Sequence, residues 1–155
     1  MIFSSERKAL PIARAIRKSA LDIPLLFGRS LLRASFLTAL GDHAGECWFV
    51  DMFHRNGAET DAQWQFMQTM AADGVAIPTA NHAFGWDGMA HCAAALKAGG
   101  GEPLRAIEYL ETGAVLAGAS GACSFSRDNH NGRFEPGPHT ITRWKDRRLE
   151  DVEED

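Results

Sequence analysis

The sequence predicts an α/β fold: a parallel sheet with flanking helices. Between residues 1 and 53, short apolar stretches alternate with segments of helical periodicity, in the order strand, helix, strand, helix, strand. This alternation is typical of parallel strands joined by right-handed helical crossovers. Hydrophobic residues make up 45% and charged residues 23% of the 155-residue chain, which is a globular composition in a chain long enough to bury a sizeable core.

The first predicted strand ends at Ile2 and Phe3, and a helix follows it. Ser5 stands at the position of an N-cap, although Lys8 replaces the acid of a capping box. Pro11 lies inside this helix and should either kink it or mark a later start. The apolar side of the helix is formed by five residues with helical spacing: Leu10, Ile12, Ala13, Ile16 and Ala20.

Two more strands and a second helix complete this first part of the chain. Residues 24–27 form a continuous apolar run, which is typical of a strand covered on both faces. Residues 31–40 have helical periodicity, and Gly41 ends that helix. The apolar residues 47–50 are the third predicted strand.

Two helices are expected next, at residues 61–70 and 83–98. Thr60 or Asp61 is the expected N-cap of the first. The second is rich in alanine and ends at three consecutive glycines, 99–101. Its small side chains would let another element approach closely.

The last third of the chain combines a helix with a closing pair of strands. The helix is predicted at residues 103–110, and the strands at 122–125 and 140–144, joined by the polar loop 126–138. The tail from Glu150 is acidic, and we expect it to fray.

Charge and hydropathy limit the kinds of partner that the chain can bind. The net charge of −4 argues against a nucleic-acid binder. The first 33 residues nevertheless carry seven basic side chains and two acids; such a basic helix can contact a membrane or a phosphate, or simply be a solvated surface. No apolar run approaches the roughly 18 residues of a membrane span, and Arg14 and Arg17 interrupt any signal-peptide core, so we expect the chain as written to be cytoplasmic.

No catalytic or metal-binding constellation is expected. Residues 118–121 approach G-x-S-x-G without completing it, and favour a turn. His91 and Cys92 are neighbours on a helix, so they point in different directions and cannot pair directly. The histidines lack H-E-x-x-H spacing, and residues 128–131 favour an Asx-rich turn over a metal site. No CxxC pair occurs among the three cysteines, Cys47, Cys92 and Cys123. We therefore predict no enzymatic activity, no cofactor and no metal.

Four motifs, in this order and spacing, are similar to those of one family. Residues 23–28 resemble the second strand of that family's C-terminal lobe. Residues 84–88 resemble an aromatic-Asp-small motif that opens a long helix, and residues 93–99 the close of that helix. Residues 121–125, with Asn-Gly at 131–132, resemble a G-x-x-x-F strand and its turn. In these motifs, and along nearly its whole length, the chain resembles the C-terminal half of type 1 periplasmic binding proteins, the branched-chain amino-acid receptors of ABC importers.

The resemblance implies a truncated part of a two-lobed receptor. Residues 1–53 would be the core of the C-terminal lobe, and residues 54–125 a helical segment that packs on an N-terminal lobe absent from this chain. Residues 126–155 would be the returning loop, closing strand and acidic tail. The helix at 83–98 would then expose an apolar face, through which we expect the chain to self-associate. The signal peptide of relatives belongs to the absent part, so the full-length parent would be periplasmic.

The resemblance also implies where a ligand binds. Ligands of this family lie between the lobes, at the carboxyl ends of parallel strands. In amino-acid-binding relatives an acidic side chain after the second strand holds the ligand ammonium, and Arg29 stands at about that position here. An arginine fork suits a carboxylate or phosphate, so an anionic ligand is one hypothesis, and a surface arginine at a helix start is the alternative. The ligand-binding residues expected on this basis are Ser4, Ser5, Gly28, Arg29, Ser30 and Asp51.

The predicted function is capture of a small ligand, anionic or amino-acid-like, between two lobes for an ABC importer, without chemistry. The partners would be that ligand and, in the full-length parent, a membrane permease. Because one lobe covers only one side of a ligand, tight binding by this chain alone is not expected. Two alternatives stay open: a cytoplasmic ligand-sensing module of the same fold, and an enzyme that uses its cysteines or histidines.

Overall fold

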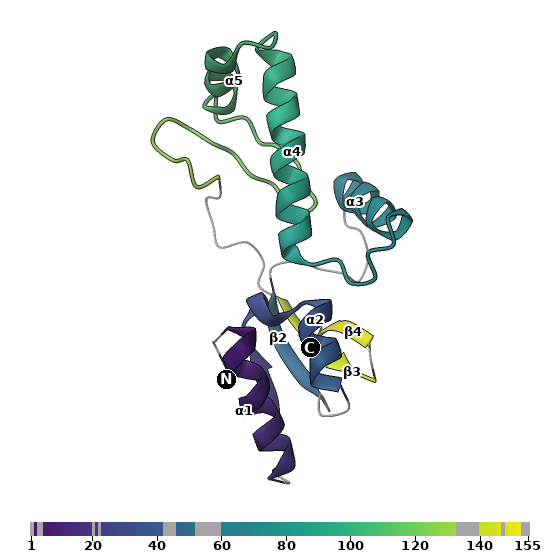
Figure 1. The fold of residues 1–155 in the computed structure, drawn as a ribbon. Coiled ribbons are helices and arrows are strands. Elements are labelled where there is room, and N and C mark those ends of the chain that lie inside the picture. The colour runs from purple at the N-terminus through teal and green to yellow at the C-terminus, as the bar shows by residue number, and fades with distance from the viewer. Residues whose placement is uncertain are drawn as a thin grey trace. The chain divides into compact units, whose positions relative to one another are not determined.

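The computed structural model describes residues 2, 5–19, 21, 23–41, 46–51, 60–132, 140–146 and 148–152 (Figure 1). The chain divides into two compact units. Unit 1 comprises Met1–Gly57 and Pro138–Asp155, and unit 2 comprises Ala58–Gly137. The assignment of these units to lobes of a larger protein stays a prediction.

Unit 1 is built on a mixed four-stranded sheet, in which the strands follow one another in space as they do along the chain. β1 and β2 are parallel, and the pairs β2–β3 and β3–β4 are antiparallel. Ile2 adds a parallel bridge to Phe27, and its N–H donates to the Leu26 carbonyl at 2.7 Å. The predicted parallel order of the first three strand segments is therefore confirmed. The strands are β1 (Leu25–Phe27), β2 (Cys47–Asp51), β3 (Thr140–Lys145) and β4 (Arg148–Val152).

Helices α1 (Glu6–Lys18) and α2 (Ala34–Leu40) contact each other and pack against this sheet, and the short 3-10 helix η1 (Arg29–Leu31) follows β1. Three phenylalanines form the centre of the core: the Phe27 ring stacks on Phe49 at 5.3 Å and meets the edge of Phe36 at 5.2 Å. All three are inaccessible to solvent. Leu26, between the buried positions of β1, is half-buried, so the second face of β1 is less covered than the apolar run predicted.

Helix α1 confirms the predicted position of Ser5 and excludes one of the two alternatives given for Pro11. It begins at Glu6 and continues through Pro11, so Pro11 does not mark a later start. Ser5 occupies the N-cap position, but its side chain makes no capping hydrogen bond; its carbonyl accepts from Lys8 and Ala9.

The basic residues of α1 are not all solvated. Arg17 donates from Nη1 to the Ile23 carbonyl at 2.9 Å and from Nη2 to the Glu46 carbonyl at 2.8 Å. Arg14 also donates to a carbonyl, that of Ala39. Arg17 thus joins the end of α1 to the segments that lead into β1 and β2.

Unit 2 contains three helices: α3 (Asp61–Ala72), α4 (Ala80–Ala98) and α5 (Pro103–Leu110). Thr60 caps α3 by accepting from the Gln63 N–H at 3.2 Å, as predicted. α4 begins three residues earlier than predicted, because Thr79 and His82 form a capping box in which the Thr79 N–H donates to His82 Nδ1 at 3.1 Å. Gly99 lets α5 approach α4: a Cβ at this position would lie 2.7 Å from the Ala106 nitrogen.

Two predictions about the last third of the chain are wrong. Residues 122–125 do not form a strand; Cys123 makes only an isolated bridge to Leu116, within an irregular loop that follows α5 and runs beside α4 (Figure 1). The tail from Glu150 is not frayed as far as Val152, since Arg143 Nη2 donates to Glu150 at 2.8 Å and Thr142 Oγ1 donates to Asp151 at 3.1 Å across the β3–β4 hairpin.

Among the described residues, no helix combines the length and the apolar character needed to cross a bilayer.

We expect replacement of Arg17 by methionine to lower the free energy of unfolding by about 1–3 kcal/mol, because two backbone carbonyls would lose their donors. Urea denaturation followed by circular dichroism measures the change. Arg7 lies exposed on the same helix, and Arg7→Met is the matched control, expected within about 0.5 kcal/mol of the parent. Equal losses in the two variants would contradict a structural role for Arg17.

Candidate functional site

The predicted ligand-binding residues of unit 1 lie at one edge of its sheet, called here the strand-end edge. Ile2 pairs with Phe27, and Phe27 lies opposite Phe49 in a parallel register. The chain therefore leaves these three positions in the same direction, towards Ser5, towards Gly28, Arg29 and Ser30, and towards Asp51. The register brings together the five predicted residues that the structure describes; Ser4 lies outside the described residues.

Exposure separates these five residues into two groups. Ser5, Arg29 and Ser30 are exposed, whereas Gly28 is buried. Asp51 is only 1% exposed, and it lies opposite Thr140 of β3 in the sheet. The exposed part of the strand-end edge is therefore formed by Ser5, Arg29 and Ser30.

A second arginine, which was not among the predicted site residues, contacts η1. Arg33 donates from Nε to the Ser30 carbonyl at 2.9 Å, which holds its side chain against η1. Arg33 Nη1 also lies 3.9 Å from Glu6 Oε2. The strand-end edge thus carries Arg29 and Arg33, and the charge of Arg33 is partly offset by the Glu6 carboxylate.

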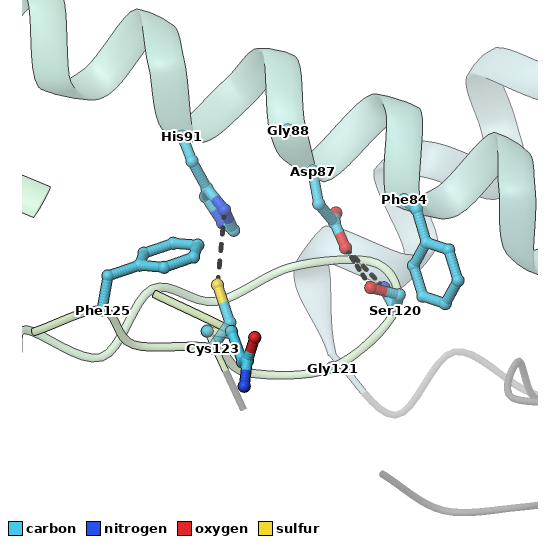
Figure 2. Close-up of a pocket in the computed structure, with 10 residues that line it drawn as sticks. Phe84, Asp87, Gly88, His91, Ser120, Gly121, Cys123 and Phe125 are labelled. Atoms are coloured by element: carbon cyan, nitrogen blue, oxygen red, sulfur yellow. Dashed lines mark hydrogen bonds between the residues drawn. The ribbon is translucent and has the colours of Figure 1, made fainter. Parts of the chain in front are cut away.

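Unit 2 contains a pocket of about 250 Å³ between α4 and the loop that follows α5 (Figure 2). Phe84, Asp87 and His91 point into it from one side of α4, because residues three and four apart share a helix face. Ser120, Cys123 and Phe125 line it from the loop.

Asp87 fixes the loop to the helix. Its carboxylate is 6% exposed and accepts three hydrogen bonds: from the Ala119 N–H at 2.6 Å, the Ser120 N–H at 2.8 Å and Ser120 Oγ at 2.5 Å. Gly118 lies so close that a Cβ there would be 2.6 Å from Asp87 Cγ. The predicted turn at 118–121 is confirmed, and its serine, Ser120, donates hydrogen bonds to the Asp87 carboxylate.

His91 lies one helical turn beyond Asp87 and also contacts the loop. Its Nδ1 lies 3.4 Å from Cys123 Sγ, and its Nε2 lies 3.4 Å from the Ala117 carbonyl oxygen. A carbonyl oxygen can only accept, so the proton of the neutral ring belongs on Nε2, and Nδ1 is left as an acceptor facing the thiol.

The polar residues 128–131 form the expected Asx turn, in which Asn129 Oδ1 accepts from the Asn131 N–H at 3.0 Å. His130 Nε2 lies 3.0 Å from Glu111 Oε1. In the part of the chain that the structure describes, no three side chains of the metal-binding types converge on one point.

Comparison with known proteins gives matches at the level of structure. No protein-family model matches the chain, and no curated protein matches its sequence. The leucine-binding protein LivK of Thermotoga maritima superposes with a TM-score of 0.81 at 16% identity, over 98% of this chain and 43% of that one. LivJ of Streptococcus pneumoniae, solved in complex with isoleucine, gives 0.72 at 18% identity, over 97% and 43% of the two chains. The chain has the type 1 periplasmic-binding-protein fold.

Other solved proteins with this fold bind different molecules. An ABC-transporter solute-binding protein from R. palustris, solved in complex with benzoate, superposes with a TM-score of 0.70 at 18% identity, over 93% of this chain and 39% of that one. The chain therefore spans about two fifths of the length of such proteins, and the resemblance inferred from its motifs is confirmed at the level of the fold.

Sequence reasoning missed the hydrogen bonds by which Asp87 fixes the loop to α4, and it missed the pairing of His91 with Cys123. Asp87 and His91 are four residues apart on a helix, which is a signal that both serve one face. Ala119 and Ser120, which bond to Asp87, and Cys123, which contacts His91, lie more than 30 positions later in an irregular loop. The only cysteine weighed as a partner of His91 was its neighbour Cys92, which is exposed.

We expect Gly118→Ala to destabilise unit 2 by about 1–3 kcal/mol, because the added methyl would overlap the Asp87 carboxylate. Gly85 offers the opposite control. It lies inside α4, and a Cβ at this position would have no neighbouring atom within 4 Å, so Gly85→Ala should stabilise the helix by roughly 0.5–1 kcal/mol. Thermal unfolding of both variants tests the pair, and a neutral Gly118→Ala would show that the loop is free to move away from α4.

Proposed function

We propose that this chain is the ligand-capturing part of a solute-binding receptor for an ABC importer. Three observations support the proposal: the type 1 periplasmic-binding-protein fold, the parallel register that gathers three strand ends at one edge, and the exposed polar groups there. In open α/β sheets, ligands bind outside the carboxyl ends of the strands. The register is the observation that carries the proposal, because without it the predicted residues would not meet at one edge of the sheet.

The ligand we propose carries a carboxylate or a similar planar anion. Arg29 is exposed at the start of η1, and the exposed Ser30 adds a hydroxyl. A guanidinium donates two parallel hydrogen bonds to a carboxylate, which gives orientation as well as attraction. Leucine, isoleucine and benzoate, the molecules named for three proteins of this fold, all contain a carboxylate.

The chain spans 43% of the LivK structure, so a ligand would be enclosed only with help from further protein. An open edge covers a small ligand on one side, whereas effective sites bury most of the ligand surface. We therefore propose weak binding by this chain alone. In the proposed parent, a second lobe would close over the ligand, a membrane permease would receive the complex, and the receptor would work outside the cytoplasmic membrane.

The expected measurement is a nuclear magnetic resonance titration of the chain with leucine and with benzoate. Amide signals of Gly28, Arg29 and Ser30 should shift with dissociation constants on the order of 1 mM, which corresponds to about 4 kcal/mol of binding free energy. Leucinamide and benzamide, which lack the carboxylate, should leave these signals unchanged.

The variant Arg29→Gln should weaken binding of the carboxylates about tenfold, and the effect should shrink at high salt because part of the attraction is coulombic. Arg7→Gln removes an exposed positive charge from the same unit and serves as the control. Identical shifts for benzoate and benzamide, or equal affinities in the two variants, would contradict recognition of an anion by Arg29.

We also propose that the isolated chain self-associates through α4 and α5 of unit 2. Large apolar side chains are exposed on both helices, with Met89 at 73% and Leu104 at 75%. Leu96 and Ile107 are also about half exposed. A surface of this kind favours association, and a second copy of the chain presents the same surface.

The double variant Met89→Lys/Leu104→Lys should reduce the weight-average mass measured by light scattering at high protein concentration to that of one chain. Val115 is equally exposed, but it lies outside both helices, so Val115→Lys should leave the mass unchanged. A parent chain that scatters as a monomer at every concentration would refute the proposal.

A further inference from the structure

Cys123 and His91 form a pair that neither the fold nor the proposed ligand capture requires. The two side chains come from different segments of unit 2, and the Sγ to Nδ1 distance is 3.4 Å (Figure 2). A nucleophile within hydrogen-bond reach of a base, with the base held by a third group, is the arrangement that activates cysteine and serine side chains. The third group here is the Ala117 carbonyl, 3.4 Å from Nε2.

The orientation of the imidazole suits proton acceptance. With the Nε2 proton directed at Ala117, the lone pair of Nδ1 faces the Cys123 thiol. Deprotonation by His91 gives a thiolate beside an imidazolium, and the thiolate is the nucleophilic form of cysteine.

The geometry is held by groups outside the pair. The three hydrogen bonds to Asp87 fix Ala119 and Ser120, which lie between Ala117 and Cys123 in the loop. The Cys123 N–H and carbonyl both bond to Leu116, at 2.9 and 2.7 Å. Both contacts of His91 therefore lie on a loop segment that is tied to α4 and to itself.

The pair is also accessible to a small molecule. It lines the pocket of about 250 Å³, with Phe84 and Phe125 as apolar walls, and Cys123 is only partly buried. Because a cavity of about 150 Å³ holds benzene, this volume admits a small molecule of about ten heavy atoms rather than a large ligand. Asp87 and His91 are the ionisable side chains that line the pocket beside Cys123 among the described residues, and the Asp87 carboxylate is engaged by the loop.

We propose that Cys123 is a preorganised reactive thiol whose partner is a low-molecular-weight disulfide. His91 Nδ1 takes the thiol proton, and the Cys123 thiolate attacks one sulfur of the disulfide. The bond between the two disulfide sulfurs breaks, a new bond joins Cys123 to the attacked sulfur, and the other half leaves as a thiolate that takes up a proton. Cys123 is oxidised to a mixed disulfide, and the small disulfide supplies the oxidising equivalent.

The other two cysteines of the chain are internal references. Cys92 follows His91 directly in α4 but is exposed on another side of the helix. Cys47 is inaccessible on β2, and burial raises the pKa of its thiol, an effect that the nearby Arg17 partly opposes. On exposure alone, Cys92 would react first; on the proposed activation, Cys123 reacts first.

The test is the rate of reaction of the full chain with 4,4′-dithiodipyridine, with each cysteine followed by peptide mass spectrometry. At pH 6 we expect Cys123 to react at least tenfold faster than Cys92, and Cys47 to react slowest. In His91→Gln, the Cys123 rate should fall about tenfold while the Cys92 rate stays constant, with circular dichroism as the check on folding.

The pH dependence of the parent chain gives a second readout that needs no variant. A thiolate–imidazolium pair keeps Cys123 reactive well below the pH at which an ordinary thiol ionises, about 8.5. An ordinary thiol loses reactivity roughly tenfold for each unit that the pH falls below that value. A Cys123 rate that follows the Cys92 profile, or that is lower than the Cys92 rate at pH 6, would overturn the proposal.

Discussion

The parallel register of β1 and β2, extended by the bridge from Ile2 to Phe27, is the constraint from which the proposed function of unit 1 follows. Parallel neighbours end at the same edge, so residues far apart in sequence meet there. The register is held by the phenylalanine core: Phe27 and Phe49 stack across the strand pair, and Phe36 of α2 packs on Phe27. A slip of one residue would turn these rings to the other face, so the aromatic packing and the position of the strand-end edge depend on each other.

Unit 2 depends on a different kind of constraint, a buried carboxylate with several donors. A loop as irregular as residues 111–132 leaves backbone N–H groups without partners in a sheet, and those that are buried need other acceptors. Asp87 supplies acceptors for two of them and for the Ser120 hydroxyl. Gly118 allows the approach, since any side chain would occupy the position of the carboxylate. The pocket and the His91–Cys123 pair exist because this carboxylate holds the loop against α4.

Much of unit 1 could be predicted from sequence because local signals agreed with the tertiary structure. The alternation over residues 1–53 specifies parallel strands. In unit 2, Thr60 likewise caps α3 as its type suggests. The wrong predictions concern segments whose structure depends on contacts with residues outside the segment. Residues 122–125 have the composition of a strand, but Cys123 pairs with Leu116 and Ser124 donates to Gly132, so no long ladder forms. The acidic tail is ordered through Arg143 and Thr142, across a turn where Asp146, rather than glycine, adopts a positive φ of 50°.

The side chains that helix α4 exposes bear on the expectation that this chain is part of a larger assembly. Its covered side holds small residues and two buried polar ones, Asp87 and His91, whereas Met89 and Leu96 lie exposed. A helix whose outer side faces only water would carry charged residues on that side. Besides Asp87 and two histidines, however, Lys97 is the one basic or acidic residue of α4. A helix that is apolar on several sides is typical of a protein interior. The sequence of α4 is thus suited to contacts on two sides of the helix. The loop of unit 2 covers one of these sides. Burial of the other side by further protein would stabilise the helix that holds Asp87 and His91 in place.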